Sequence, residues 1–229
     1  MHSLHAYFLR PGDPTLPILY LVDRIRDGRS FATRRVTAIQ HGEAIFTLSA
    51  SFHCAETGVE HQQAMPAAPD PLTLPTFAER WAPHAGRLGD WYTRPRPIDT
   101  RTASVFRAGI TGPSAEPTLQ TWFRSDGPLP DDPLLHACVV AYASDMSLLD
   151  TIVGHHGLNW DDGSLMGASL DHAMWFHRPF RADQWLLYDQ ESTVATGGRG
   201  VGRGEIYTAG GVLVVSVVQE GLIRSVVKR

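Results

Sequence analysis

Asp145 is the residue whose position most clearly suggests chemistry, because it lies within a long apolar stretch, residues 131–149, that is predicted to be helical. Between Leu134 and Ala143 nearly every residue is apolar, which predicts a helix buried on all sides. A lone carboxylate is costly there unless it is paired or takes part in a reaction. Burial raises the pKa of a carboxyl group toward neutral pH, as a general base requires. A structural ion pair with a buried arginine is the alternative interpretation.

Two histidines form a second group with chemical potential. His172 and His177 lie near Asp171 and the pair His155-His156, and these residue types bind metal ions. Residues five positions apart point to opposite faces of a strand, so the spacing argues against one shared ion. We therefore expect no metal and no cofactor.

The segment Gly197–Gly204 is similar to a phosphate-binding loop only in its glycine content. It lacks the Gly-Lys-Ser/Thr ending and a following helix. Its glycines are expected to let a long strand bend round a helix. Arg199 and Arg203 are expected to form a solvated rim, with contact to the phosphates of a ligand as the alternative.

Charge and cysteine content exclude several classes of protein. The chain has 229 residues and a formal net charge of −4, so nucleic acid is not an expected partner. Its 2 cysteines lie far apart, which favours a reducing, cytoplasmic location over a disulfide framework. No apolar run approaches the roughly 20 residues that cross a membrane, and Met1–His5 lacks the features of a signal peptide. We expect no membrane insertion.

The elements that must position Asp145 are mostly strands. Hydrophobic patterning predicts them at residues 18–24, 30–40, 43–53, 119–124, 166–175, 184–191, 194–207 and 212–222. His41-Gly42 and Ala209-Gly210-Gly211 are the predicted turns. Prolines recur between the two groups of strands. We divide the chain into an N-terminal half at 1–64, a proline-rich connection at 65–104 and a C-terminal half at 105–229.

The most specific motif of the chain is Asp171-His-Ala-Met-Trp-Phe-His-Arg-Pro-Phe180, and further motifs lie at residues 7–13, 26–31, 184–188 and 211–221. Together these motifs resemble the bacterial acyl-CoA thioesterase II family. The resemblance implies an α+β double hot-dog fold, in which long antiparallel sheets wrap round a buried central helix. It also implies hydrolysis of fatty acyl-CoA to free fatty acid and CoA.

The resemblance implies a catalytic trio of Asp145, Ser169 and Gln219. The aspartate of the family's Ala-Ser-Asp motif matches Asp145, and the glutamine of its Val-Gln-Glu-Gly motif matches Gln219. Its hydroxyl residue, usually Thr or Ser, matches Ser169, which by itself would be read as a strand filler. The three side chains are expected to hold and activate one water, whereas a covalent Ser169 route lacks a histidine base at a defined spacing.

One departure from the family lies in the first half. Family members continue further upstream with a first strand and the first half's own central helix, so we expect the first repeat to be incomplete here. The leading hypothesis is a cytoplasmic acyl-CoA hydrolase, and the alternative is a catalytically weak acyl-CoA-binding or scaffold protein. A hot-dog hydratase would need an Asp–His pair, and neither Ser169 nor Gln219 is His. Long sheet edges that need covering predict a homo-oligomer, a dimer or tetramer.

Overall fold

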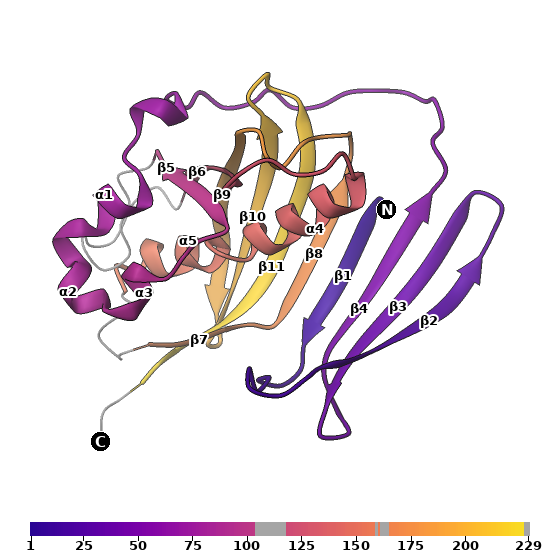
Figure 1. The fold of residues 1–229 in the computed structure, drawn as a ribbon, viewed down its shortest axis with the longest axis horizontal. Coiled ribbons are helices and arrows are strands. Elements are labelled where there is room, and N and C mark those ends of the chain that lie inside the picture. Colours follow the sequence, from indigo (N-terminus) through magenta and orange to yellow (C-terminus); the bar gives the residue numbers. More distant parts are fainter. Residues whose placement is uncertain (104–117, 159, 161–164, 227–229) are drawn as a thin grey trace.

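The computed structural model describes residues 1–103, 118–158, 160 and 165–226. Its strands form an 11-stranded antiparallel sheet in the order β2-β3-β4-β1-β8-β11-β10-β9-β6-β5, with β7 paired to β11 off this path. The sheet curves round two helices, α4 and α5, that lie against its C-terminal half (Figure 1). The strands are β1 (Ser3–Phe8), β2 (Leu19–Asp27), β3 (Phe31–Gln40), β4 (Glu43–His53), β5 (Ile98–Thr102), β6 (Thr118–Ser125), β7 (Leu165–Ser169), β8 (Asp171–Phe176), β9 (Leu186–Thr196), β10 (Arg199–Thr208) and β11 (Leu213–Ser225). The predicted α+β class is confirmed.

Residues 1–53, all of which are described, form β1 to β4 and contain no helix. The β3–β4 hairpin turns at His41 and Gly42, whose φ angles of 50° and 79° are those of a tight hairpin turn, as predicted. Every residue of β2 is exposed, and Figure 1 shows no helix over this part of the sheet. β1 pairs with β4 on one side and with β8 on the other, so the two halves share one continuous sheet.

The segment between β4 and β5 is tied to the C-terminal half by side-chain hydrogen bonds. Gln62 Nε2 donates to the carbonyl oxygen of Gly211 at 2.9 Å, and Trp122 Nε1 donates to that of Pro69 at 2.8 Å. Five short helices follow: η1 (Pro71–Thr73), α1 (Phe77–Trp81), η2 (Ala82–His84), α2 (Ala85–Leu88) and α3 (Asp90–Thr93). The connection therefore follows a defined path over the second half.

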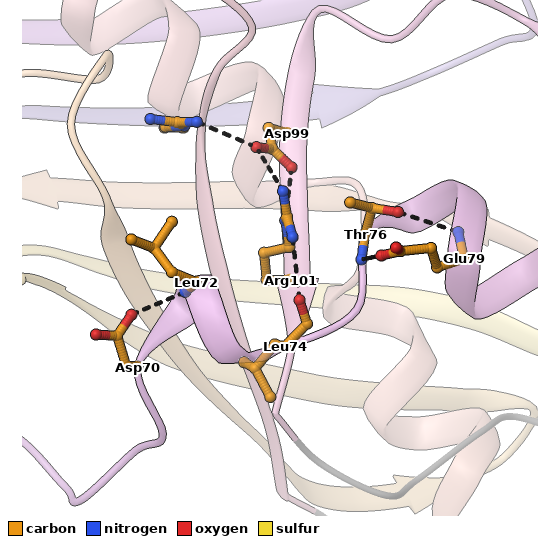
Figure 2. Close-up of polar contacts among 8 residues, drawn as sticks. Asp70, Leu72, Leu74, Thr76, Glu79, Asp99 and Arg101 are labelled. Atoms are coloured by element: carbon orange, nitrogen blue, oxygen red, sulfur yellow. Dashed lines mark hydrogen bonds and ion pairs between the residues drawn. The ribbon is translucent and has the colours of Figure 1, made fainter.

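Figure 2 shows how the start of these short helices is fixed. Thr76 and Glu79 form a capping box at the start of α1, in which each side chain bonds the other's backbone N–H. Arg101 Nη1 donates to the carbonyl oxygen of Leu74 at 3.0 Å, while its Nε bonds Asp99 at 3.0 Å. Arg101 and Asp99 belong to β5, which pairs with β6, so this strand of the C-terminal sheet lies inside the range 65–104 that the sequence suggested as a connection.

The apolar stretch at 131–149 folds into two helices, so the prediction of a single helix is wrong. Asp132 caps α4 (Pro133–Ser144) by accepting from the N–H of Leu134 at 2.9 Å, and Pro133 occupies the first turn. Asp145 is the C-cap of α4, and α5 (Leu148–His155) begins shortly after it. Asp145 therefore lies at a helix break.

The prediction that this stretch is buried on all sides is also wrong. One face of α4 lies on the sheet, while Leu134 and Tyr142 are 54% and 57% exposed and Cys138 is exposed on the opposite face. By length and composition the stretch Pro133–His155 could cross a membrane, in contrast to the sequence-based expectation. Half of its most apolar window is buried inside the protein, as in the core helix of a globular domain.

Glycines bring α5 close to the sheet. A Cβ atom at Gly200 would lie 2.6 Å from Ile152 Cγ2, and one at Gly202 would lie 3.0 Å from the carbonyl oxygen of Leu148. Both glycines are in β10, two positions apart, and so face the same side of the sheet. Their missing side chains leave the space in which the first two turns of α5 pack.

Two strand boundaries differ from prediction. Gly197 and Gly198, with φ of 59° and 76°, form the turn between β9 and β10, so the predicted strand break near residues 191–194 is wrong. The glycines of Gly197–Gly204 form a hairpin turn and allow close packing of α5, whereas the sequence predicted that they let a strand bend round a helix. The predicted strand at 166–175 is interrupted at Leu170, which separates β7 from β8.

Candidate active site

Asp145, Ser169 and Gln219 come from three elements that meet at the break between α4 and α5. Asp145 caps the C-terminal end of α4, and Ser169 is the last residue of β7. Gln219 lies in β11, directly opposite Gly202 of β10, the glycine over which Leu148 packs. Close packing of α5 at Gly202 therefore places the helix break beside Gln219.

The three side chains lie within hydrogen-bonding distance of one another. Gln219 Nε2 lies 2.6 Å from Asp145 Oδ1 and 2.6 Å from Ser169 Oγ. Ser169 Oγ donates to the same Asp145 Oδ1 at 2.9 Å. Because an amide nitrogen only donates, Gln219 supplies one proton to the carboxylate and one to the hydroxyl. The three polar groups predicted from sequence are thus brought together.

Asp145 itself is exposed, so the premise that it is buried is wrong. Successive helical residues are about 100° apart, and Ser144, one position earlier, is the last buried residue of α4. Asp145 therefore emerges on the exposed flank of α4, with Leu134, Cys138 and Tyr142. Gln219, in contrast, is 0% exposed and Ser169 is partly buried. The site combines a solvent-accessible carboxylate with a buried amide.

A further residue of the site, His172, was not among the predicted site residues. Its Nδ1 lies 2.8 Å from Gln219 Oε1, and its Nε2 lies 2.8 Å from Ser144 Oγ. His172 is 5% exposed on β8, between β1 and β11. From the sequence, His172 was examined only as a possible metal ligand beside His177. Its neighbours in sequence gave no indication of a contact with Gln219, which lies 47 positions away.

Burial has the largest effect and lowers the pKa of His172, while the hydrogen bond from His172 to Gln219 and the charges of Asp145 and Asp171 act in the opposite direction. The net effect keeps the ring neutral at pH 7. His177 instead places Nε2 2.8 Å from Ser216 Oγ, outside this network. The described part of the chain contains no cluster of three metal-ligating side chains.

The two arginines of the glycine-rich segment pair with glutamates across neighbouring strands. Arg199 Nε donates to Glu220 Oε1 at 2.9 Å, and Arg203 forms an ion pair with Glu191. Both arginine side chains are at least half exposed. They form the solvated rim that the sequence predicted.

Comparison with known proteins identifies the family of the chain. The family model described as acyl-CoA thioesterase matches residues 95–222, and the model of the acyl-CoA thioesterase N-terminal domain matches residues 1–53. A human relative, acyl-coenzyme A thioesterase 8, is 39% identical over 98% of this chain and 73% of its own length. Acyl-CoA thioesterase 2 of Haemophilus influenzae is 37% identical over 98% of this chain and 79% of its own.

Solved structures agree with the sequence relatives. An acyl-CoA thioesterase II of Mycobacterium marinum superposes with a TM-score of 0.81 at 49% identity, covering 98% of this chain and 80% of that one. A hot-dog protein of Alicyclobacillus acidocaldarius superposes with a TM-score of 0.79 at 20% identity over 99% of this chain and 79% of that one, which confirms the hot-dog fold. With matches to both family models and relatives well above 30% identity, the chain belongs to the acyl-CoA thioesterase family.

Proposed function

We propose that this protein hydrolyses fatty acyl-CoA to a free fatty acid and CoA, using a water activated by Asp145, Ser169 and Gln219. Family membership supports the reaction. The observation that carries the assignment of residues is the hydrogen-bonded triangle of Asp145 Oδ1, Ser169 Oγ and Gln219 Nε2, with sides of 2.6, 2.6 and 2.9 Å. The side chains of Ser169 and Gln219, which come from distant parts of the sequence, converge on one oxygen of the Asp145 carboxylate.

Asp145 serves as the general base in this proposal. Its two hydrogen bonds within the triangle both end on Oδ1, so Oδ2 is the oxygen that accepts a proton from water. The water oxygen attacks the thioester carbon, the carbon–sulfur bond breaks, and the CoA thiolate takes the proton back from Asp145. Ser169 and Gln219 hold the carboxylate in one orientation and contribute by positioning.

Charge that develops on the thioester oxygen requires a hydrogen-bond donor. Ser147, the N-cap of α5, makes no side-chain capping bond, because its hydroxyl donates to Gln190 Oε1 at 2.9 Å. The first turn of α5, which begins three residues after Asp145, therefore carries the positive end of the helix dipole and has no side-chain cap on its backbone N–H groups. We assign this turn as the donor.

A catalytically weak acyl-CoA-binding protein is the second candidate. It is favoured by the exposure of Asp145, because general-base catalysis gains from exclusion of bulk water. An Asp–His hydratase is disfavoured, because His172 is buried behind Gln219 and meets Asp145 only through that amide.

Release of free thiol from a panel of acyl-CoA esters tests the proposal. The purified protein should turn over, and Asp145→Ala and Asp145→Asn should lower kcat by about 10²-fold or more while ester binding persists. Asp23→Ala, on exposed β2, is the control for loss of a surface carboxylate. Undiminished hydrolysis by both Asp145 variants would reject the assignment, and binding without turnover in the wild type would support the second candidate.

Two further expectations belong to this proposal. The sheet ends in β2 and β5, whose outer edges favour association into a dimer or tetramer, which light scattering after gel filtration measures. A cytoplasmic location, no membrane insertion and no nucleic-acid partner remain predictions from composition. Fractionation of cells and the salt dependence of any binding to nucleic acid test them.

A further inference from the structure

His172 has a defined partner on each ring nitrogen, although it does not contact Asp145 or Ser169. Nδ1 faces Gln219 Oε1 at 2.8 Å, and Nε2 faces Ser144 Oγ at 2.8 Å. The ring is 5% exposed, Gln219 is 0% exposed and Ser144 is 0% exposed. A buried polar group is retained only with its hydrogen bonds satisfied, so the direction of each bond can be worked out.

The Gln219 amide determines the first direction. Its –NH₂ group must face the Asp145 carboxylate, because an amide oxygen 2.6 Å from a carboxylate oxygen would be repelled. Its carbonyl oxygen then faces His172, and a carbonyl oxygen only accepts. His172 must therefore carry a proton on Nδ1.

The remaining directions follow from the neutral ring. With Nδ1 protonated, Nε2 is an acceptor, and the Ser144 hydroxyl donates to it. The chain of donors runs from Ser144 through His172 and Gln219 to Asp145, and each bond polarises the next. If the ring takes a second proton, Nδ1 still donates to Gln219, and the Ser144 hydroxyl turns to the carbonyl oxygen of Ala141, 2.9 Å away. The amide keeps its orientation in both states.

We propose that His172 is a positioning residue, which holds the Gln219 amide with its –NH₂ group toward Asp145 and Ser169 through the proton on Nδ1. This role rests on the proposed function of the trio. Without a donor at this position, the buried carbonyl oxygen of Gln219 has no hydrogen-bond partner, so the amide is no longer held at its oxygen end and can turn its –NH₂ group away from Asp145 and Ser169. The general base then loses a hydrogen bond from Gln219, and Ser169 loses its donor.

Two variants of similar size separate this role from general support of the fold. His172→Asn keeps an amide N–H at the position of Nδ1, whereas His172→Gln keeps a polar group at the position of Nε2 and removes the donor to Gln219. We expect His172→Asn to retain kcat within about threefold and His172→Gln to lose about tenfold or more, with KM changed less than about twofold in both. The acidic limb of kcat against pH should persist in His172→Asn, because His172 is not the base.

The ring tautomer gives a readout independent of turnover. In protein carrying ¹⁵N-labelled histidine, two-bond ¹H–¹⁵N correlations at pH 7.5 should show one ring protonated on Nδ1, and this signal should be missing from His172→Asn. Free neutral histidine carries its proton mainly on Nε2, so a ring protonated on Nδ1 is distinguishable from solvent-exposed histidines. A proton on Nε2 of His172 in the folded wild type would overturn the inference.

The kinetic outcomes distinguish this inference from the proposed function. Loss of activity in Asp145→Ala with normal kcat in His172→Gln would reject the role of His172 and leave the function intact. Normal activity in Asp145→Ala would reject both. Melting curves identify a variant that fails to fold. In that case the tautomer of His172 in the wild-type protein tests the inference by itself.

Discussion

Replacing Gln219 with Glu probes the hydrogen-bonded triangle directly, because the Gln219 Nε2 that lies 2.6 Å from Asp145 Oδ1 becomes a carboxylate oxygen. Two unit charges at that separation repel by about 6 kcal/mol with an effective dielectric constant of about 20. Asp145 is exposed to solvent, which screens the pair. If this screening removes about half of the repulsion, about 3 kcal/mol remains. That energy raises the pKa of the proton shared by the two carboxylates by about 2 units.

The Gln219→Glu variant should therefore hold one proton between the two carboxylates well above pH 4. We expect the acidic limb of its kcat–pH profile to move up by about 2 units, with activity partly restored at pH 9. The folded-state pKa is raised above the unfolded value of about 4.3. The variant should accordingly match the wild type in stability below about pH 4 and lose stability as the pH rises through the raised pKa.

Free-thiol release from pH 5 to pH 9 and melting temperatures over the same range measure both effects. Gln219→Met, of similar length and without charge, should lower kcat while its acidic limb stays at the wild-type position. An unshifted limb in Gln219→Glu, together with an equal loss of melting temperature at pH 5 and pH 8, would show that residues 145 and 219 are not adjacent in solution.

Two further predictions concern the packing of α5 against β11 and the ion pair of Arg181 with Asp183. Gly221→Ala would place a Cβ atom 2.3 Å from Leu149 Cδ2, so unfolding should become easier by about 1–3 kcal/mol. Gly210→Ala, whose Cβ would meet nothing closer than 3.8 Å, should leave the melting temperature unchanged, and equal losses in the two variants would contradict the packing argument. The hydrogen bond from Arg181 holds the pKa of Asp183 well below its usual range, so this pair should stabilise the fold above about pH 4 and lose its effect as the pH falls. Asp183→Asn should therefore melt below the wild type at pH 7, with a gap that closes toward pH 2, whereas a constant gap would refute the linkage.

Local chemistry made several elements predictable. Asp132 and Pro133 mark the start of α4. The Asp132 side chain accepts a hydrogen bond from a free N–H group of the first turn, and Pro133 has no N–H group that would need a partner. His41-Gly42 forms a tight hairpin turn, because Gly and, less readily, other residues adopt positive φ. The same local reasoning failed at Gly197–Gly204. Gly197 and Gly198 form a turn with positive φ, whereas Gly200 and Gly202 make room for Ile152 and Leu148. A run of glycines in the sequence does not distinguish these two roles.

The candidate site was predictable only in part. The resemblance placed Asp145, Ser169 and Gln219 together, and their hydrogen bonds agree with that arrangement. The argument from hydrophobicity put Asp145 in the interior, but apolar residues do not report which side of a helix meets the sheet. His172 was missed because its partners are distant in sequence, and adjacency across a sheet depends on strand order.

The sequence by itself indicated most of the long strands and the start of α4, and it carried the motifs of the family, because these features depend on neighbouring residues. Only the tertiary structure decided that α4 and α5 break at Asp145, that this carboxylate reaches solvent, and that His172 stands behind Gln219. These features depend on how α5 settles over Gly200 and Gly202 and on where β8 lies between β1 and β11. Such contacts join residues far apart along the chain, so no local pattern specifies them.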